Sequence, residues 1–377
     1  MDTARSSDVD ASDVLVVGAG IAGLSHAVAA LERGLTVTII ERDARAVGAS
    51  IRNFGHACVT AQTGELLELA MVSREKWLRY GSRADFFRVE SGALAIARTA
   101  AESAVLEELS ASRDVGQVRL LTEGEVRAQL GAASDPEIRG GALLRDDLRV
   151  DPREAVGALA AWLAEQPGVT FYWRTSFLGA AGGVVHTSRG DFRAARTVVC
   201  VGHDLDLLYP EIADEYRIER CALEMARVTA PAGFHLAPAV LTGTSMLRYP
   251  AFAETGAAAA LAVEMAAQHP ELLAIVANVM FTQHPDGTLI VGDSHQYDLT
   301  QPPFLAESTA DTLLDAVTRV LGVELTVVER WQGVYASSAR QPFLIAEPTP
   351  GVTVAIVTSG VGMTISLGLA EKTFSTF

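Results

Sequence analysis

Short apolar runs alternate with helical patterns at the start of the chain. Residues 14–17 are all apolar and lead into a glycine-rich turn. A helical pattern follows over residues 21–33 and ends at Gly34, and a second apolar run covers residues 35–40. Strands that alternate with helices at this spacing pair in parallel and are covered on both faces. The pattern therefore predicts an α/β fold built on a parallel sheet.

The segment that follows combines a long loop with further helices and strands. Residues 43–64 are rich in small residues and have no steady period, whereas residues 65–80 have helical spacing. Thr122 with Glu125 predicts a capping box, and Asp151-Pro152 predicts a helix that runs to Gly168. We expect strands at residues 171–177, which end at Phe177, and at 197–201, which lead to Gly202.

From residue 216 to 330 the pattern changes to short strands and turns. An alanine-rich helix is predicted at 256–267 and another helix at 304–321, closed by Gly322. The first pattern then returns, with an apolar strand at 352–358, a glycine turn and a helix from Met363. This change of sequence pattern predicts a second, interleaved α+β domain with a mainly antiparallel sheet. Residues 1–12 are polar, and we interpret them as a flexible tail.

Composition excludes several classes of partner. The 377 residues carry a net charge of −16 without a basic cluster, so we expect no binding to nucleic acid or to anionic membranes. No apolar run is long enough to span a bilayer, and the start of the chain lacks a signal-peptide pattern. The three cysteines stand far apart, which predicts reduced thiols, no metal site and a cytoplasmic location.

The first glycine turn has the spacing of a dinucleotide-binding motif. It reads Gly18-Ala19-Gly20-Ile21-Ala22-Gly23, follows a predicted strand and opens a predicted helix, whose N-terminus attracts phosphate. Glu41, followed by Arg42, ends the next strand, where a carboxylate accepts hydrogen bonds from ribose hydroxyls. We therefore predict that this unit binds the ADP part of a cofactor.

A second glycine turn near the end of the chain bears on the choice of cofactor. A bound flavin accumulates negative charge near N1 and the C2 carbonyl when it is reduced, so something positive must face it. The N-terminus of the predicted helix offers its backbone amides for this purpose. The residues of this turn are Gly360, Val361, Gly362, Met363 and Thr364.

Together these segments resemble the superfamily of D-amino-acid oxidase, glycine oxidase and sarcosine oxidase. The resemblance rests on residues 13–42, on the turn at 359–364 and on a loop with the sequence Ala49-Ser50-Ile51-Arg52-Asn53-Phe54-Gly55. Three shorter pieces, at 150–152, 198–202 and 330–335, follow in the superfamily's order. The order of these pieces is more specific than any one of them.

The resemblance implies FAD bound to a discontinuous domain made of residues 13–80, 141–215 and 331–377. Residues 81–140 and 216–330 would then form the substrate domain, with a sheet that covers the flavin. Relatives that tether their flavin use a cysteine just before the tyrosine of the segment that matches Gly333-Val334-Tyr335. No cysteine follows Cys221 here, so we expect FAD to be bound without a covalent link.

A narrower resemblance, and the chemistry of an anionic substrate, select the candidate substrate residues. The residues at 50–55, 248–249 and 292–295 are similar to those of a bacterial subgroup proposed to oxidise aminophosphonates, although His56 departs from its pattern. Arg248 and Tyr249, in a strand-like stretch, offer a guanidinium and a hydroxyl for an anion, and Arg52 or Arg340 offers a second cation. His56 and His295 are candidates for proton transfer.

The predicted reaction is the oxidation of a small anionic amine. Hydride would pass from its α-carbon to N5 of the flavin, the imine would be hydrolysed, and O2 or another acceptor would take the electrons. An aminophosphonate related to 2-aminoethylphosphonate, with or without an N-methyl group, is the first candidate. Glycine, sarcosine or a D-amino acid, a 2-hydroxy acid oxidised by a dehydrogenase, and a non-catalytic flavoprotein subunit are the alternatives.

Overall fold

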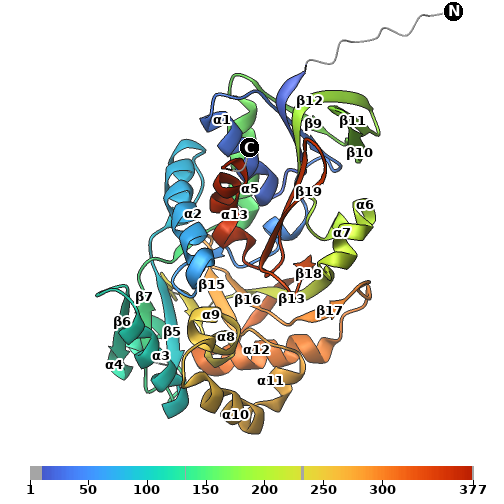
Figure 1. The fold of residues 1–377 in the computed structure, drawn as a ribbon. Helices are drawn as coiled ribbons and strands as arrows, with labels where there is room; N and C mark the ends of the chain where they lie inside the picture. The colour runs from blue at the N-terminus through green and yellow to red at the C-terminus, as the bar shows by residue number, and fades with distance from the viewer. Residues whose placement is uncertain (1–10, 132, 231–232, 376–377) are drawn as a thin grey trace, which may run out of the picture.

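The computed structural model describes residues 11–131, 133–230 and 233–375, in two layered halves (Figure 1). One half is a sheet with helices on both faces, and the other is a larger sheet with helices packed against it. The expected flexible tail, residues 1–12, lies mostly outside the described residues, and Ser12 already belongs to the first strand. None of the described helices has the length and the apolar character needed to cross a membrane.

The first sheet has the predicted parallel centre. Its parallel strands lie in the order β9-β2-β1-β12-β20, and β10, β11 and β19 add antiparallel pairs. Its strands are β1 (Ser12–Val17), β2 (Val37–Glu41), β9 (Val169–Trp173), β10 (Phe177–Ala181), β11 (Val184–Thr187), β12 (Gly190–Val199), β19 (Phe343–Thr349) and β20 (Val352–Val357).

Both faces of this sheet are buried, as an apolar run such as β1 requires. Val14 and Val16 pack into one apolar cluster, whereas Leu15 and Val17 pack into another on the opposite face. The helices of the first face are α1 (Ile21–Glu32), α2 (Gly64–Arg83), α5 (Pro152–Ala164) and α13 (Gly362–Phe374). Helix α13 packs against both α1 and α2, so the two ends of the chain are joined in one core (Figure 1).

The opposite face carries the short helices α6 (Leu205–Leu208) and α7 (Pro210–Glu215), which follow the 3-10 turn η2 (Gly202–Asp204). The expected strand at 171–177 is wrong as a single element, because it is split into β9 and β10. Arg174 between them has a φ of 55°, which ends the first strand.

The second sheet is mainly antiparallel. Its order is β17-β13-β16-β15-β14-β5-β7-β6, with β18 paired to β13, and only β14 and β5 run in parallel. Its strands are β5 (Ala93–Ala97), β6 (Val118–Thr122), β7 (Gly140–Leu144), β13 (Glu219–Thr229), β14 (Ala239–Leu241), β15 (Met280–Gln283), β16 (Leu289–Gly292), β17 (Gln296–Asp298) and β18 (Thr326–Ser337).

The expected segment boundaries at 141 and 331 fall inside strands of this second sheet. Residue 141 lies in β7 and residue 331 in β18, which pairs with β13 over Glu219 to Thr229. The helices on this side are α3 (Ala100–Ser112), α4 (Glu123–Leu130), α8 (Gly243–Arg248), α9 (Pro250–Ala253), α10 (Ala258–Gln268), α11 (Pro270–Ala274) and α12 (Glu307–Leu321). The capping box at Thr122 and Glu125 is present as predicted.

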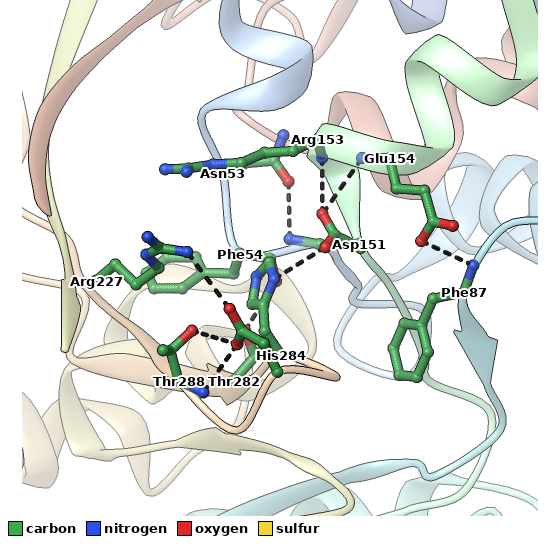
Figure 2. A network of polar contacts seen from close by, with 12 residues as sticks. Asn53, Phe54, Phe87, Asp151, Arg153, Glu154, Arg227, Thr282, His284 and Thr288 are labelled. Carbon is green, nitrogen blue, oxygen red and sulfur yellow. Dashed lines mark hydrogen bonds and ion pairs between the residues drawn. The ribbon is translucent and has the colours of Figure 1, made fainter. Parts of the chain in front are cut away.

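A small antiparallel sheet connects the halves. It consists of β3 (His56–Ala57), β8 (Leu148–Val150) and β4 (Arg88–Val89). Immediately after β8, Asp151 caps α5 by accepting hydrogen bonds from the amides of Arg153 and Glu154 at 2.9 and 3.4 Å. Its other oxygen lies 3.0 Å from Nδ1 of His284, in the β15–β16 hairpin (Figure 2). One side chain thus starts a helix of the first half and binds a hairpin of the second.

Replacing Asp151 separates these two roles. Asp151→Ala removes the cap and the His284 contact, so we expect the free energy of unfolding to fall by about 2 kcal/mol. Asp151→Asn keeps one oxygen for the cap but loses the charge and the second oxygen that faces His284, and it should cost about half as much. Urea denaturation of the holoprotein measures both variants. Equal losses for alanine and asparagine would show that the cap contributes nothing.

Candidate active site

A cavity of about 590 Å³ lies between the two sheets, and residues far apart in the sequence line it. Most of the residues singled out from the sequence are among them. These are Gly18, Gly20, Ile21, Ala22, Glu41, Arg42, Ala49, Ser50, Arg52, Asn53, Phe54, His56, Phe177, Gly202, Arg248, Tyr249, His295, Gly360, Val361, Gly362, Met363 and Thr364. Ala19, Gly23 and Gly55 stand beside the lining, and Arg340 is elsewhere.

The first glycine turn forms a cradle of bare backbone. A Cβ atom on Gly23 would lie 1.8 Å from the carbonyl oxygen of Gly18, and one on Gly18 would lie 2.6 Å from that of Cys200. Gly18 also has a φ of 100°, which favours glycine. Helix α1 therefore starts in direct contact with β1, and its first residues, Ile21 and Ala22, line the cavity.

The carboxylate of Glu41 is fixed at the end of β2. One oxygen accepts a hydrogen bond from the amide of Ala19 at 2.8 Å, and the other accepts one from the amide of Asp43 at 3.0 Å. Arg42 points to Asp204, with 2.5 Å between Nη1 and the carboxylate. Glu41 keeps acceptor capacity beside the cradle, which suits a ribose with free hydroxyls.

The loop after β2 is held by its own side chains. It forms the 3-10 turn η1 (Ala49–Ile51), and the amide group of Asn53 donates to the carbonyls of Ala49 and Ser50, both at 3.0 Å. Asn53 also accepts from the amide of Gly55 at 2.8 Å. Arg52 donates to the carbonyl of Gln332 in β18 at 3.1 Å, so the loop reaches the second sheet.

The second glycine turn lies against an arginine and a tyrosine. Gly360 has a φ of 75°, and a Cβ atom there would lie 3.0 Å from the hydroxyl of Tyr335 and 3.4 Å from Nη2 of Arg248. Helix α13 starts at Gly362, and its Thr364 hydroxyl accepts a hydrogen bond from the amide of Cys58 at 3.0 Å. The helix N-terminus and the guanidinium thus give this end of the cavity a positive potential.

Arg248 belongs to a helix, so the expected strand-like stretch is wrong. It is the last residue of α8, and only Tyr249 is extended, because a residue before proline is driven out of the helical region. Nη2 of Arg248 donates to the hydroxyl of Tyr335 at 2.9 Å, and Nη1 lies 3.4 Å from that of Tyr297. These hydroxyls orient the guanidinium without neutralising it.

Arg340 does not join this group. Its guanidinium donates to the carbonyl of Glu215 at 2.6 Å, and the residue is exposed. Of the three arginines considered from the sequence, Arg52 and Arg248 line the cavity and Arg340 does not.

His56 is buried on β3 and hydrogen-bonded to a carboxylate. Its Nε2 lies 2.8 Å from Asp147, and its Nδ1 has no partner. The sequence predicted no metal site, yet ligand atoms of His56, Cys58 and Asp147 lie within 4.8 Å of one another. The other oxygen of Asp147 accepts from the amide of Thr60 at 2.7 Å, so hydrogen bonds already occupy this carboxylate. We assign no metal to this cluster.

Asp293 is a cavity residue that the sequence did not single out. It follows β16 and is buried, and its carboxylate accepts a hydrogen bond from the side chain of Asn278 at 3.0 Å. His295, two residues later, donates from Nδ1 to the carbonyl of Val276 at 2.9 Å. The sequence signal for Asp293 is the polar tetrapeptide Gly292-Asp293-Ser294-His295, which follows an apolar strand.

The geometry defines a dinucleotide-binding protein with a second, positively polarised turn over the same cavity. Comparison with protein families identifies the class. The chain belongs to the DAO family of FAD-dependent oxidoreductases, whose family model matches residues 13–375. A comparison with curated protein sequences gives no match.

Solved structures share this fold at low sequence identity. Glycine oxidase from Geobacillus kaustophilus is 20% identical with a TM-score of 0.77, over 97% of this chain and 93% of that one. L-proline dehydrogenase from P. horikoshii is 18% identical with a TM-score of 0.79, over 97% and 92%. FAD-bound L-alpha-glycerophosphate oxidase from Mycoplasma pneumoniae is 17% identical with a TM-score of 0.74, over 98% and 95%.

The cavity fits the cofactor of this family. The cradle at Gly18 and Gly23 leaves room for a pyrophosphate only because no side chains are present, and Glu41 is placed for the ribose. The turn at 360–364 and the loop at 49–56 would hold the flavin ring. Bound FAD supplies the two-electron acceptor, and the protein orients it and excludes water.

The cradle gives a direct test of cofactor binding. We expect Gly23→Ala to lose most of its FAD, because the new methyl group clashes with the backbone of Gly18. The FAD content of the purified protein is measured as a ratio of two absorbances. One is taken at about 450 nm, where flavin absorbs, and the other at about 280 nm, where aromatic side chains absorb.

Gly157→Ala is the matched control. Gly157 lies within α5, and a Cβ atom there would meet nothing within 4 Å. This variant should keep its FAD and gain up to about 1 kcal/mol of stability. Full FAD occupancy in Gly23→Ala would contradict the assignment of the cradle.

Proposed function

We propose that this protein oxidises a small amine that carries a negative group, with an aminophosphonate related to 2-aminoethylphosphonate as the first candidate. The observation that carries the proposal is the position of Arg248 in the cavity, against the Gly360 turn and oriented by Tyr335. A guanidinium and a phenol hydroxyl together bind a phosphonate or a carboxylate. An anion held there lies next to the turn that would face the flavin ring.

Two arginines in the cavity support a doubly charged substrate group. Arg52 is anchored on Gln332 and Arg248 on Tyr335, which are three residues apart along β18. The two anchoring residues are thus about 10 Å apart along the strand. We take Arg248 with Tyr335 as the primary anion site and Arg52 as a second positive charge on the cavity lining. A carboxylate needs only the primary site, and amino acids are therefore the second class of substrate to test.

Anaerobic reduction of the bound flavin by a panel of amines tests the proposal. We expect 2-aminoethylphosphonate or its N-methyl derivative to bleach the flavin spectrum, and glycine, sarcosine and D-alanine to react more slowly or not at all. Faster bleaching by the amino acids would replace the phosphonate with a carboxylate as the anionic group. If no amine bleaches the flavin and a 2-hydroxy acid does, amine oxidation is wrong.

Variants of Arg248 test the anion site. Arg248→Met removes the charge but keeps much of the volume, and we expect KM for the best substrate to rise by about 100-fold, corresponding to a charge-assisted hydrogen bond of about 3 kcal/mol. Arg248→Lys keeps the charge but loses the fork, so it should fall between Met and the wild type.

The readouts are steady-state kinetics and FAD content, which should be unchanged in both variants because Arg248 lies against the turn without being part of the cradle. An unchanged KM in Arg248→Met would exclude this arginine as the anion site.

A further inference from the structure

The carboxylate of Asp293 is buried without a positive partner. The residue is only 5% exposed, and its one hydrogen bond from another side chain comes from Asn278. Among the described residues, no lysine or arginine lies within 4.0 Å of it, and the nearest basic nitrogen is Nε2 of His295 at 3.7 Å. A buried carboxylate in this position carries a large desolvation cost unless a cation comes to it.

His295 does not supply that cation. Burial, followed by the charge of Arg248, lowers the pKa of His295 to about 3, so the imidazole is neutral at physiological pH. Its Nδ1 hydrogen donates to the carbonyl of Val276, which leaves Nε2 as an acceptor. An acceptor beside a carboxylate offers it no stabilisation.

Arg248, in the same cavity, is a cation without a neighbouring carboxylate. Its side-chain partners are the hydroxyls of Tyr335 and Tyr297, and no carboxylate of a described residue lies within 4.0 Å of its guanidinium. Arg248 and Asp293 are near enough to influence each other's titration, yet they form no ion pair. Arg248 and Asp293 are thus a positive and a negative group of the same lining, and neither has a direct counterion among the described residues.

We propose that Asp293 binds the ammonium group of the substrate and then accepts its proton. This inference rests on the proposed function, because it takes the substrate to be an amine with a negative group. Such a zwitterion neutralises both ends of the site at once, with its anion on Arg248 and its ammonium on Asp293. Asp293 would therefore determine the specificity for amines and prepare them for oxidation.

The proton transfer balances as a simple acid–base step. One N–H bond of the ammonium breaks, its proton binds to a carboxylate oxygen of Asp293, and the electron pair stays on nitrogen. The neutral amine then uses this pair to form the C=N bond as the α-carbon loses its hydrogen and two electrons. FAD, the cofactor of the family, is the oxidant.

The environment of Asp293 suits a base that works near neutrality. Burial raises the pKa of Asp293 to about 7, against the opposing effects of Arg248 and Asn278. The other titratable groups around it are His295, Tyr249 and Cys221. Burial raises the pKa of Tyr249 and raises that of Cys221 to about 11, so neither competes for the proton near pH 7.

The pH dependence of anaerobic flavin reduction tests the base. Below its pKa, Asp293 is already protonated and cannot take the proton, so in the wild type the rate should fall as the pH drops through about 7. This fall is the acidic limb of the profile of rate against pH. In Asp293→Asn the acidic limb should move to the pKa of the free amine, about 10. The rate at pH 7 should fall by about 100-fold or more and recover at high pH, whereas Asp293→Glu should keep a limb near neutrality.

Two control variants identify the group responsible. Asp298 is an exposed aspartate in β17 outside the cavity lining, and Asp298→Asn should leave the limb in place. His56 is the rival base, since its Nδ1 is buried without a partner. A limb that stays near pH 7 in Asp293→Asn and disappears in His56→Gln would overturn the proposal.

Ligand binding gives a second readout that does not depend on turnover. Calorimetry on the dithionite-reduced holoenzyme compares 2-aminoethylphosphonate with ethylphosphonate, and glycine with acetate, so each pair differs by the amine. In the wild type the amine should improve affinity by at least about 10-fold, and Asp293→Asn should abolish this difference. FAD content and melting temperature confirm that the variant is folded.

The two readouts separate this inference from the proposed function. If no amine reduces the wild-type flavin, the proposed function fails, and the binding pairs alone decide the role of Asp293. Equal affinity of the wild type for the amine and its deaminated partner overturns the inference. If amines reduce the flavin of the wild type and of Asp293→Asn with the same pH profile, amine oxidation stands and Asp293 is not the base.

Discussion

The contact between Gly23 and the backbone of Gly18 is the constraint on which the site depends. A methyl group cannot fit between them, so α1 starts against β1 and its N-terminus lines the cavity, where it would hold a pyrophosphate. The same helix packs on α13, whose N-terminus carries the second glycine turn. Because both turns belong to one core, the distance between the two ends of the cofactor site is fixed by packing.

The second sheet supplies what the first lacks, which is charge for a substrate. Arg248 comes from the end of a helix, Tyr335 from β18 and Asp293 from the end of β16. None of them belongs to the cofactor cradle, so the substrate can be changed without disturbing FAD. The fold as a whole therefore explains the cofactor, whereas the substrate depends on a few charged side chains over one turn.

The cofactor half could be predicted from the sequence because its signals are local. The strand, turn and helix at 14–33 follow directly from periodicity and glycine spacing, and β1, α1 and β2 occur there. The substrate residues could not be placed with the same security. Arg248 was expected in a strand but ends a helix, and Arg340 was expected to offer a second cation, but its guanidinium is bound to the carbonyl of Glu215.

These errors have a common physical cause. Which side chains face a cavity between two sheets depends on contacts between residues far apart in the sequence. Arg248 and Tyr335, for example, are 87 positions apart, and no local pattern encodes their contact. The sequence does not distinguish Asp293, because an aspartate in a polar turn is usually solvated. What distinguishes Asp293 from a solvated turn aspartate is its burial without a neighbouring cation, which only the structure shows.

A crystal structure of the reduced holoenzyme with 2-aminoethylphosphonate tests the central claim most directly. The claim is that Arg248 and Asp293, which lack direct counterions, together select a zwitterionic amine. It predicts the phosphonate within hydrogen-bond distance of Arg248 and Tyr335, and the amine nitrogen within hydrogen-bond distance of the Asp293 carboxylate. A phosphonate bound at Arg52, or an amine directed to His56 with Asp293 uncontacted, would contradict it.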